Sequence, residues 1–363
     1  MTLLIEDTEV KRLLTMEKCI DAMEEAYKEY ASGIAVNRPR LRYRVPSPGK
    51  PKQYFTNIIA GAVPKYGTAA VRINSLIRRE VVIGGFKRSD TEQPGKRSWG
   101  LVMLYSLETG ELLAIIHDFT ISGIRVGATS AVGVKHLARA NSEVLGLIGT
   151  GKQARTHLEG IAQVCPIKKV KVYSPSEEHR KEFCNVMGKT LGMDIQPENN
   201  AKAVVKNADI VCCATNSYDP VCLGEWLSKG QLVITIGNTD VTVHRVEVDE
   251  TTLVLCDFIV VSDKESVFAN KQTELMDPIE KGLFTWDKVR QLGDILIGKC
   301  KGRSSPEELI YYKNNTGMGI QFAASAAIVY EEARKSGVGR ELPTEWFGTD
   351  LSDWYEKGYY PTF

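Results

Sequence analysis

A short glycine-containing segment constrains the fold of this chain more than any other feature. Gly149-x-Gly151-x-x-Ala154 follows an apolar run, Val144–Ile148, and precedes a stretch with apolar residues at helical spacing. In such a strand–turn–helix unit, the first glycine permits a tight turn and the second lets the backbone approach a pyrophosphate. The small third residue lets the helix pack closely on the strand, and the helix N-terminus favours phosphates. A P-loop is excluded because Lys152 is not followed by Ser or Thr.

The surrounding segments decide how this motif is interpreted, because GxGxxA alone would also suit a glycine turn in another α/β fold. Apolar runs at 170–173, 210–214, 232–236 and 258–262 alternate with helical stretches. This alternation predicts an α/β fold with a doubly wound parallel sheet of the Rossmann type, and therefore a dinucleotide site. The residues expected to contact the dinucleotide lie in the turn and after the next strands: Gly149, Thr150, Gly151, Gln153, Ala154, Ser174, Ser176, Arg180, Thr215, Asn216 and Gly237.

The end of the second strand bears on the choice between NAD and NADP. An acidic residue there binds the ribose hydroxyls of NAD, whereas an arginine accommodates the 2′-phosphate of NADP. The chain has no carboxylate at this point and instead carries Ser174 and Ser176, with Arg180 beyond. This pattern favours NADP over NAD. The alternative is that the two serines only cap the following helix.

The first third of the chain has a different organisation. Residues 16–31 have the spacing of an amphipathic helix, and strand-like pieces follow at 69–77, 81–83, 100–106 and 112–117. Residues 120–138 are apolar nearly all round, which predicts a buried helix. Further on, residues 307–312 resemble a strand and 317–335 an alanine-rich helix that packs back on the N-terminal unit. We therefore expect a discontinuous α+β substrate-binding and dimerisation domain (1–124 and 317–363) and a Rossmann domain (125–316).

Charge and cysteine content narrow the classes of function. Lys and Arg total 46 against 45 for Asp and Glu, so no global field attracts nucleic acid or an anionic membrane. No apolar run reaches the roughly 18 residues of a membrane span. Eight cysteines are scattered without a CxxC pair, which suggests reduced thiols in the cytoplasm, and no His/Cys cluster suggests a metal site. Cys212 and Cys213 are expected to be packing residues.

Several ordered blocks resemble the ornithine cyclodeaminase/μ-crystallin family over nearly the full length. They are Arg125-Val-Gly-Ala-Thr-Ser, Gly149-Thr-Gly-Lys-Gln-Ala, Leu292-Gly-Asp-Ile-Leu-Ile-Gly298 through Gly302-Arg303, and Asn315-Thr-Gly-Met-Gly319. The resemblance implies a homodimer with a bound NAD or NADP, whose N-terminal domain, completed by the C-terminal helix, binds substrate. Members of this family include cyclodeaminases, alanine dehydrogenases, imine and ketimine reductases, and μ-crystallins.

The substrate side is expected to depend on arginines. Arg125 lies on the predicted buried helix, where a lone charge is too costly to leave unpaired. It needs either an internal salt bridge or a ligand carboxylate, which a guanidinium can grip in a bidentate fork. The resemblance makes Arg125 the carboxylate-binding arginine, places Arg72 where the family commonly has a substrate-contacting lysine, and offers Arg40 or Arg42 as a further contact. Most arginines of the 38–44 stretch are expected to face solvent.

The resemblance also implies a catalytic acidic residue after the glycine of the fourth strand. Asp240 is the candidate for holding or deprotonating the amino group, with Asn238 as a substitute, although a loop aspartate is often only a turn residue. Thr316 and Gly317 match the position that contacts the nicotinamide. The chain departs from the cyclodeaminase pattern in having Gly-Asn-Thr-Asp for Gly-Gly-Asp, and Gln321-Phe322 for an acidic pair. Both changes weaken the case for an ornithine side-chain amine.

These observations together predict an NAD(P)-dependent amino-acid dehydrogenase or imine reductase acting on a small amino acid or its imine. Arg125, Arg72 and Asp240 are the expected catalytic residues, and neither nucleic acid, a membrane nor a metal is expected to take part. An ornithine cyclodeaminase-type lyase that uses NAD catalytically is the first alternative. A non-catalytic, μ-crystallin-like NADP-binding protein is the second.

Overall fold

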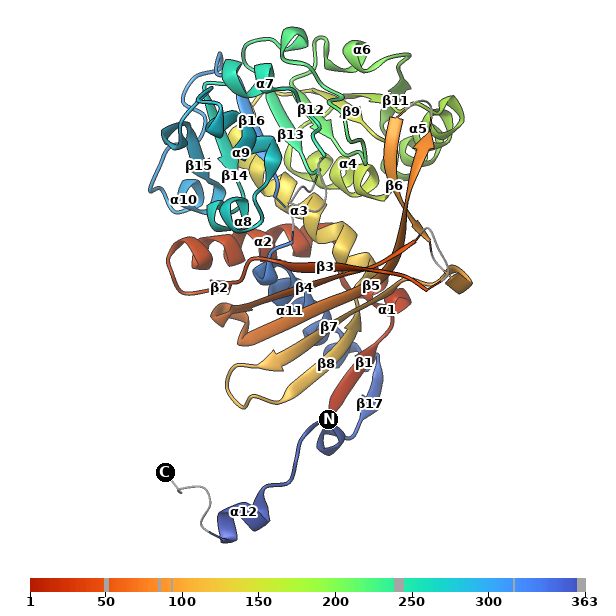
Figure 1. Ribbon diagram of the computed structural model, residues 1–363, viewed down its shortest axis with the longest axis vertical. Helices are drawn as coiled ribbons and strands as arrows, with labels where there is room; N and C mark the ends of the chain where they lie inside the picture. The colour runs from red at the N-terminus through yellow and green to blue at the C-terminus, as the bar shows by residue number, and fades with distance from the viewer. Residues whose placement is uncertain (49–51, 84–85, 93, 238–244, 316, 358–363) are drawn as a thin grey trace.

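The computed structural model describes the chain except for residues 49–51, 84–85, 93, 238–244, 316 and 358–363. Figure 1 shows two sheets, one above the other, with long helices between them. Among the helices of the described residues, none combines the length and the apolar character that a membrane span requires.

The upper sheet is of the Rossmann type. In the part of the chain that is described, it has eight strands in the order β11-β10-β9-β12-β13-β16-β14-β15, and every neighbouring pair is parallel. The strands are β9 (Val144–Ile148), β10 (Lys169–Tyr173), β11 (Asp194–Pro197), β12 (Ile210–Cys213), β13 (Leu232–Thr235), β14 (Phe258–Val261), β15 (Val289–Gln291) and β16 (Ile310–Lys313). The strand order reverses between β9 and β12, and ligands bind at such switch points.

Helices cover both faces of this sheet, as its predicted doubly wound form requires. They are α4 (Lys152–Val164), α5 (Glu177–Leu191), α6 (Ala201–Val205), α7 (Glu250–Leu255), α8 (Lys264–Ala269), α9 (Thr273–Glu280) and α10 (Leu292–Leu296). The central strands are fully buried, and Cys212 and Cys213 are core residues as expected. The strand predicted at 307–312 begins later, at Ile310.

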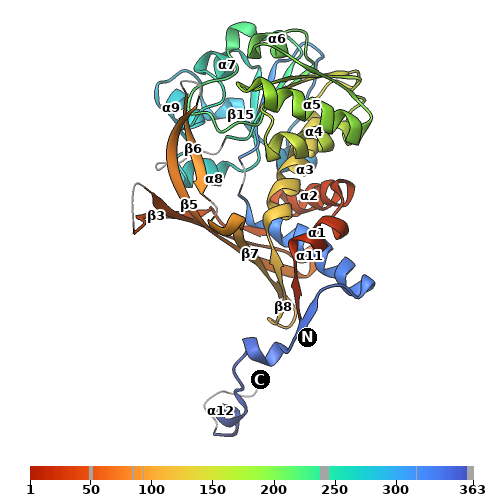
Figure 2. The same cartoon turned by 90° about the vertical axis from the view of Figure 1, so that its right-hand side faces the viewer.

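The lower sheet is mixed. Its order is β17-β1-β8-β7-β5-β4-β2, with β3 also paired to β4 and β6 to β5. The strands are β1 (Thr2–Ile5), β2 (Val36–Asn37), β3 (Leu41–Pro46), β4 (Gln53–Val63), β5 (Thr68–Ile83), β6 (Phe86–Glu92), β7 (Trp99–Ser106), β8 (Leu112–His117) and β17 (Arg340–Leu342). The pieces predicted at 69–77 and 81–83 are one long strand, β5. Figure 2 shows the β5–β6 hairpin rising from this sheet beside the Rossmann part.

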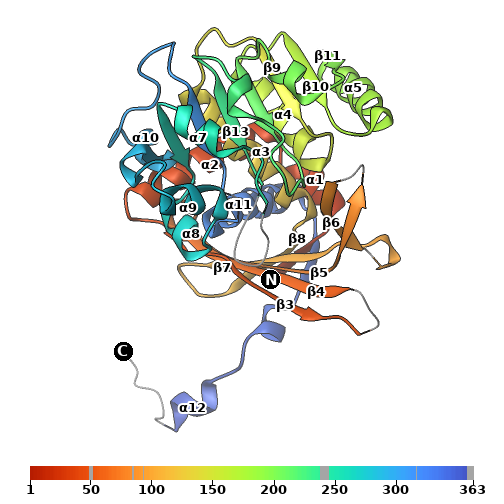
Figure 3. The same ribbon diagram turned by 45° about the horizontal axis from the view of Figure 1, so that its top comes forward.

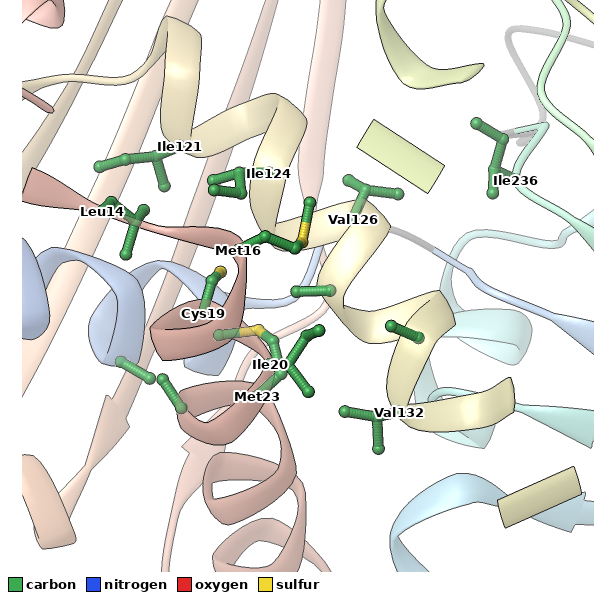
Figure 4. Close-up of a cluster of buried hydrophobic side chains, with 14 of the residues drawn as sticks. Leu14, Met16, Cys19, Ile20, Met23, Ile121, Ile124, Val126, Val132 and Ile236 are labelled. Atoms are coloured by element: carbon green, nitrogen blue, oxygen red, sulfur yellow. The ribbon is translucent and has the colours of Figure 1, made fainter. Parts of the chain in front are cut away.

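Three long helices lie between the sheets: α2 (Met16–Ala31), α3 (Phe119–Leu137) and α11 (Gly319–Ser336), with the short α1 (Asp7–Leu13) beside them. Figure 4 shows apolar side chains of α2 and α3, among them Met16, Ile20 and Val126, packed together. The predicted boundary at residue 124 falls inside α3, so one continuous helix joins the two sheets. The division into two domains stays a prediction.

The close approach of α11 to the lower sheet explains a glycine in its first turn. A Cβ atom on Gly319 would collide with the carbonyl group of Ala60 on β4. The Gly319 amide donates to Asn37 Oδ1 at 2.6 Å. Beyond β17 the chain leaves the body through a turn at Thr344–Phe347 and the helix α12 (Ser352–Glu356), as Figure 1 shows.

Candidate active site

The glycine turn after β9 has the geometry of a pyrophosphate cradle. Gly149 has a φ of 116°, and a Cβ atom there would collide with the carbonyl oxygen of Ala214 on the neighbouring strand. Gly151 precedes the first residue of α4, and a Cβ atom at this position would meet no atom within 4 Å. The helix N-terminus therefore opens onto free space at the switch point of the sheet, while Ala154 is fully buried. These residues fit a dinucleotide phosphate.

The residues expected to distinguish NADP from NAD contact one another. Thr150 Oγ1 lies 3.2 Å from Ser174 Oγ, and Ser176 caps α5 by accepting from the His179 amide at 3.2 Å. Arg180 is buried and donates to the Ser174 carbonyl oxygen, with its guanidinium carbon 5.3 Å from the centre of the Tyr173 ring. The capping interpretation therefore holds for Ser176. Arg180 points toward the strand end, and the preference for NADP stays a prediction.

A buried glutamate that the sequence analysis missed fixes the carboxyl ends of β12 and β13. Glu247 accepts hydrogen bonds from the amides of Thr215 at 2.7 Å, Ile236 at 2.8 Å and Gly237 at 2.5 Å. The Thr215 hydroxyl group donates a further hydrogen bond to this carboxylate at 2.8 Å. Burial raises the pKa of this carboxyl group. Thr215 and Gly237 are thus held in place by one side chain, whereas Asn216 is exposed at the strand end.

Two further buried residues support this arrangement. Glu274 accepts from the Glu247 amide at 2.9 Å and pairs with Lys313 of β16. Lys313 also donates to the Gly237 carbonyl oxygen at 2.5 Å. Both side chains of this ion pair are 1% exposed, so water cannot compete for them. The backbone at the ends of β12 and β13 is therefore held by buried hydrogen bonds.

Arg125 of α3 is buried and contacts the first turn of α11. Its Nη1 donates to Gln321 Oε1, and its guanidinium carbon lies 4.7 Å from the centre of the Phe322 ring. Its Nε has no hydrogen-bond partner among the described residues. Burial, followed by the charge of Arg72, lowers the pKa of this guanidinium to about 9. The alternative of an internal salt bridge for Arg125 finds no carboxylate partner in the described ranges.

Gln321 is held in turn, because its amide nitrogen donates to Tyr27 Oη at 3.0 Å and Thr129 Oγ1 at 2.9 Å. This orientation presents a neutral oxygen to Arg125. The arginine therefore keeps its positive charge and its capacity to bind a carboxylate.

Arg72 also lies near the ring of Phe322. Its guanidinium carbon is 5.4 Å from the Phe322 ring centre, and its Nε donates to Asp118 Oδ2 at 2.6 Å. A second donor, Nη1, contacts Asn74 Oδ1 at 2.8 Å. Sequence reasoning missed Asp118, although an aspartate directly before a helix with one buried arginine is a recognisable signal. The structure thus brings Arg72 and Arg125 together around one ring.

The other predicted substrate residues lie on the same side of the lower sheet. Arg40 is buried, and its Nη1 would lie 2.8 Å from a Cβ atom on Gly317, which has a φ of 101°. Arg42 donates from Nε to Asn57 Oδ1 at 2.8 Å. The expectation that most arginines of the 38–44 stretch face solvent was wrong: only Arg38 is exposed. Alternation along the strand directs the other three toward α11 and the Rossmann part.

Three of the predicted residues cannot be placed. Asp240 with its possible substitute Asn238, and Thr316, lie outside the described residues. The proton-handling role of Asp240 therefore remains a prediction from the sequence.

The fold and this site define a two-sheet α/β protein with a dinucleotide-binding turn and two buried arginines beside one aromatic ring. A family model described as the ornithine cyclodeaminase/mu-crystallin family matches residues 1–337. The chain therefore belongs to this family, as the sequence blocks predicted.

Individual relatives show how far the similarity extends. A Delta(1)-pyrroline-2-carboxylate reductase of Bacillus thuringiensis is 34% identical over 244 residues, which cover 67% of this chain and 74% of that protein. The structure of Thermococcus litoralis Delta(1)-pyrroline-2-carboxylate reductase, in complex with NADH and L-proline, has a TM-score of 0.81 and 27% identity. The match covers 94% of this chain and 100% of the Thermococcus litoralis chain. An archaeal alanine dehydrogenase dimer with bound NAD has a TM-score of 0.79 and 27% identity, covering 94% and 99%.

Proposed function

We propose that this protein is an NAD(P)-dependent oxidoreductase acting on an α-amino acid or its imine. The observation that carries the proposal is a pyrophosphate cradle at Gly149 together with a buried, charged Arg125, which is near enough to the start of α4 for its charge to add to burial in lowering the pKa of Lys152. Relatives named as pyrroline-2-carboxylate reductase and alanine dehydrogenase share the fold, and two of their structures contain NADH or NAD. A substrate with a carboxylate next to the reacting carbon suits both features.

We assign roles in this reaction to the described arginines and glycines, and to Asp240 from the sequence alone. Arg125 grips the α-carboxylate, because its Nε and its charge are available for a bidentate contact. Arg72, held by Asp118, adds positive charge next to the carboxylate without itself exchanging protons. Gly149 and Gly151 hold the pyrophosphate, and the nicotinamide, when bound, supplies or accepts the hydride. Asp240 manages the proton of the amino group.

The proposal is tested by following nicotinamide absorbance with NADH and NADPH separately. Δ1-Pyrroline-2-carboxylate, pyruvate with ammonia, and pyruvate with methylamine cover cyclic and open-chain imines. We expect imine-dependent oxidation of the cofactor, with loss of activity in Arg125→Met. Ammonia and proline formed from ornithine, without net change in the nicotinamide band, would instead establish the cyclodeaminase reaction. Tight cofactor binding without any turnover would establish a binding protein.

We further propose that the protein is a homodimer joined through the outer face of the lower sheet. Leu41, Ile73 and Leu101 are in register on β3, β5 and β7 and are all exposed, as is Trp99 beside them. Exposed apolar patches of this kind mark interfaces. Leu101→Glu is expected to convert a dimer to a monomer in light scattering. A monomeric unmodified protein would refute the proposal.

A cytoplasmic location and a preference for NADP over NAD are also part of this proposal. All eight cysteines are free thiols, which suits a reducing cytoplasm. The preference for NADPH over NADH is decided by the same absorbance assay.

A further inference from the structure

The last part of the described chain forms an arm that leaves the body of the molecule. After β17 ends at Leu342, residues 343–357, here called the C-terminal arm, run through the turn at Thr344–Phe347 to α12. Figure 3 shows α12 standing apart from both sheets. The family model ends at residue 337, so the arm lies outside the part of the chain that this model matches.

The arm carries large apolar side chains that the structure leaves exposed. Trp346 is 70% exposed, and Phe347 and Leu351 are exposed as well. Aromatic side chains bury a large apolar area when they meet a partner, and neighbouring exposed apolar groups mark sites of protein contact. The arm is also acidic, since residues 344–357 contain four carboxylate side chains against one lysine: Glu345, Asp350, Asp353 and Glu356 against Lys357.

A groove on the outer face of the lower sheet has an apolar floor. The groove has a volume of about 750 Å³, and Ile73, Trp99, Leu101 and Ile115 are among the residues that line it. Ile73 of β5 and Leu101 of β7 are paired in register, and Trp99 lies two residues before Leu101. Paired residues and every second residue along a strand share a face, so these side chains form one surface.

The rim of this groove is basic. Lys96 and Arg97, from the turn before β7, line the groove and are exposed. Neither forms an ion pair with a residue that the structure describes. Asp7 also lines the groove, but its carboxylate accepts hydrogen bonds from the amide of Thr120 at 2.7 Å and from its hydroxyl group at 3.0 Å. An apolar floor with a basic rim is complementary to a segment that is both aromatic and acidic.

The arm leaves its own chain in the direction away from this groove. β17 runs antiparallel to β1, with Leu342 opposite Thr2. The groove lies toward the other end of β1, where Leu4 and Asp7 line it, and no residue of the described arm lines the groove of its own chain. A second copy related by a twofold axis presents the same groove from the opposite direction, and a reciprocal exchange of arms closes such a pair.

The arm is long enough for this exchange. Residues 343–351 span up to about 30 Å when they are extended. Two sheets that pack face to face lie about 10 Å apart, so an arm that starts at the edge of one sheet can cross to a facing sheet. The groove also shares Ile73, Trp99 and Leu101 with the surface through which we propose that the homodimer forms.

We propose that the C-terminal arm of one copy docks in the groove of a second copy, with Trp346 on the apolar floor and the carboxylates of the arm beside Lys96 and Arg97. This inference rests on the proposed homodimer, and it does not depend on the reaction proposed above. The arm thus extends the contact between two sheets into an exchange of segments between two chains.

The test places a photoreactive side chain on the arm of the full-length protein. In Trp346→p-benzoylphenylalanine, irradiation links the side chain at position 346 to whatever it touches. Denaturing gel electrophoresis then separates covalent dimers from single chains, and mass spectrometry identifies the linked peptide. We expect a covalent dimer in which position 346 is joined to residues that line the groove. Val186→p-benzoylphenylalanine, at an exposed apolar position of α5, is the matched control and should give no covalent dimer.

Two variants measure what the contact contributes to the dimer. Trp346→Ser should raise the Kd of the dimer at least about tenfold in a dilution series followed by sedimentation velocity, as the loss of an aromatic anchor does. Leu255→Ser, which removes an exposed apolar side chain of α7, should leave the Kd unchanged. Arg97→Glu should also raise the Kd. Combining it with Trp346→Ser should add little, because the two residues act in one contact.

The possible failures are distinguishable. A protein that is dimeric in light scattering but forms no covalent dimer, or is linked at residues outside the groove, would overturn the arm exchange and leave the homodimer standing. Links confined to single chains would overturn it as well, because the arm would then fold back on its own chain. A monomeric unmodified protein would overturn both. Arm exchange in a protein that reduces no imine would leave this inference intact and refute the proposed reaction.

Discussion

Replacing Arg125 by methionine is expected to weaken substrate binding while stabilising the protein without ligand. The pKa of Arg125 in the folded state is lowered to about 9, with burial as the main cause and Arg72 as the next. Because this value lies below that of the unfolded chain, the charged form disfavours folding at every pH below about 9. At neutral pH the lowered pKa corresponds to on the order of 5 kcal/mol. Removing the charge should therefore stabilise the folded protein, and the loss of the hydrogen bond to Gln321 and of packing on Phe322 offsets part of this gain in stability.

The net expectation is a gain of about 1–3 kcal/mol in the free energy of unfolding, since methionine fills a similar volume without a charge. Urea unfolding followed by circular dichroism measures it. The KM for an imine should rise by about 100-fold, the value of a lost charge-assisted bidentate contact. Arg72→Met is the contrasting variant, because it leaves Asp118 buried without its cation and should cost about 3–5 kcal/mol. An Arg125→Met protein that is destabilised but binds substrate normally would refute this reasoning.

Three further predictions concern the cradle, the helix packing and pH. Gly149→Ala should lower NADH affinity at least about tenfold in fluorescence titration, because a Cβ atom collides with the Ala214 carbonyl group. Gly192→Ala, also at positive φ but in open space, should not. Gly319→Ala should cost about 1–3 kcal/mol in urea unfolding, since α11 must move off Ala60. Burial lowers the pKa of His157 from 6.5 to about 4. The unfolded chain therefore takes up a proton first, and stability is complete above pH 6.5 and falls by about 3 kcal/mol toward pH 4. His157→Gln should flatten this part of the stability–pH curve, and an unchanged curve would contradict the assignment.

The parts of the fold that depend on neighbouring residues were predictable from the sequence. The glycine turn at 149–154 and the alternation of strands and helices require only local spacing, and they predicted the parallel sheet. Arg125 was identified because one charge stood in an apolar helix. These signals are contained within about 20 residues, where periodicity and turn chemistry determine structure.

The partners of these residues depend on topology and could not be predicted. Gln321 meets Arg125 across 196 positions, and Asp118 meets Arg72 across 46. Three arginines lie near the Phe55 ring because β3, β4 and β5 pair in one register, and a slip of one residue would turn each of them to the other face. Glu247 binds three backbone amides that follow two different strands, an arrangement with no local pattern.

The central claim is that the turn at Gly149 holds a nicotinamide dinucleotide facing the carboxylate pocket of Arg125. The most direct measurement uses reduced cofactor carrying deuterium at both C4 positions of the nicotinamide, with Δ1-pyrroline-2-carboxylate as substrate and mass spectrometry of the product. We predict one deuterium on the α-carbon of proline, and little labelled product from Arg125→Met. Proline without the label, or equal labelling by Arg125→Met, would contradict the claim.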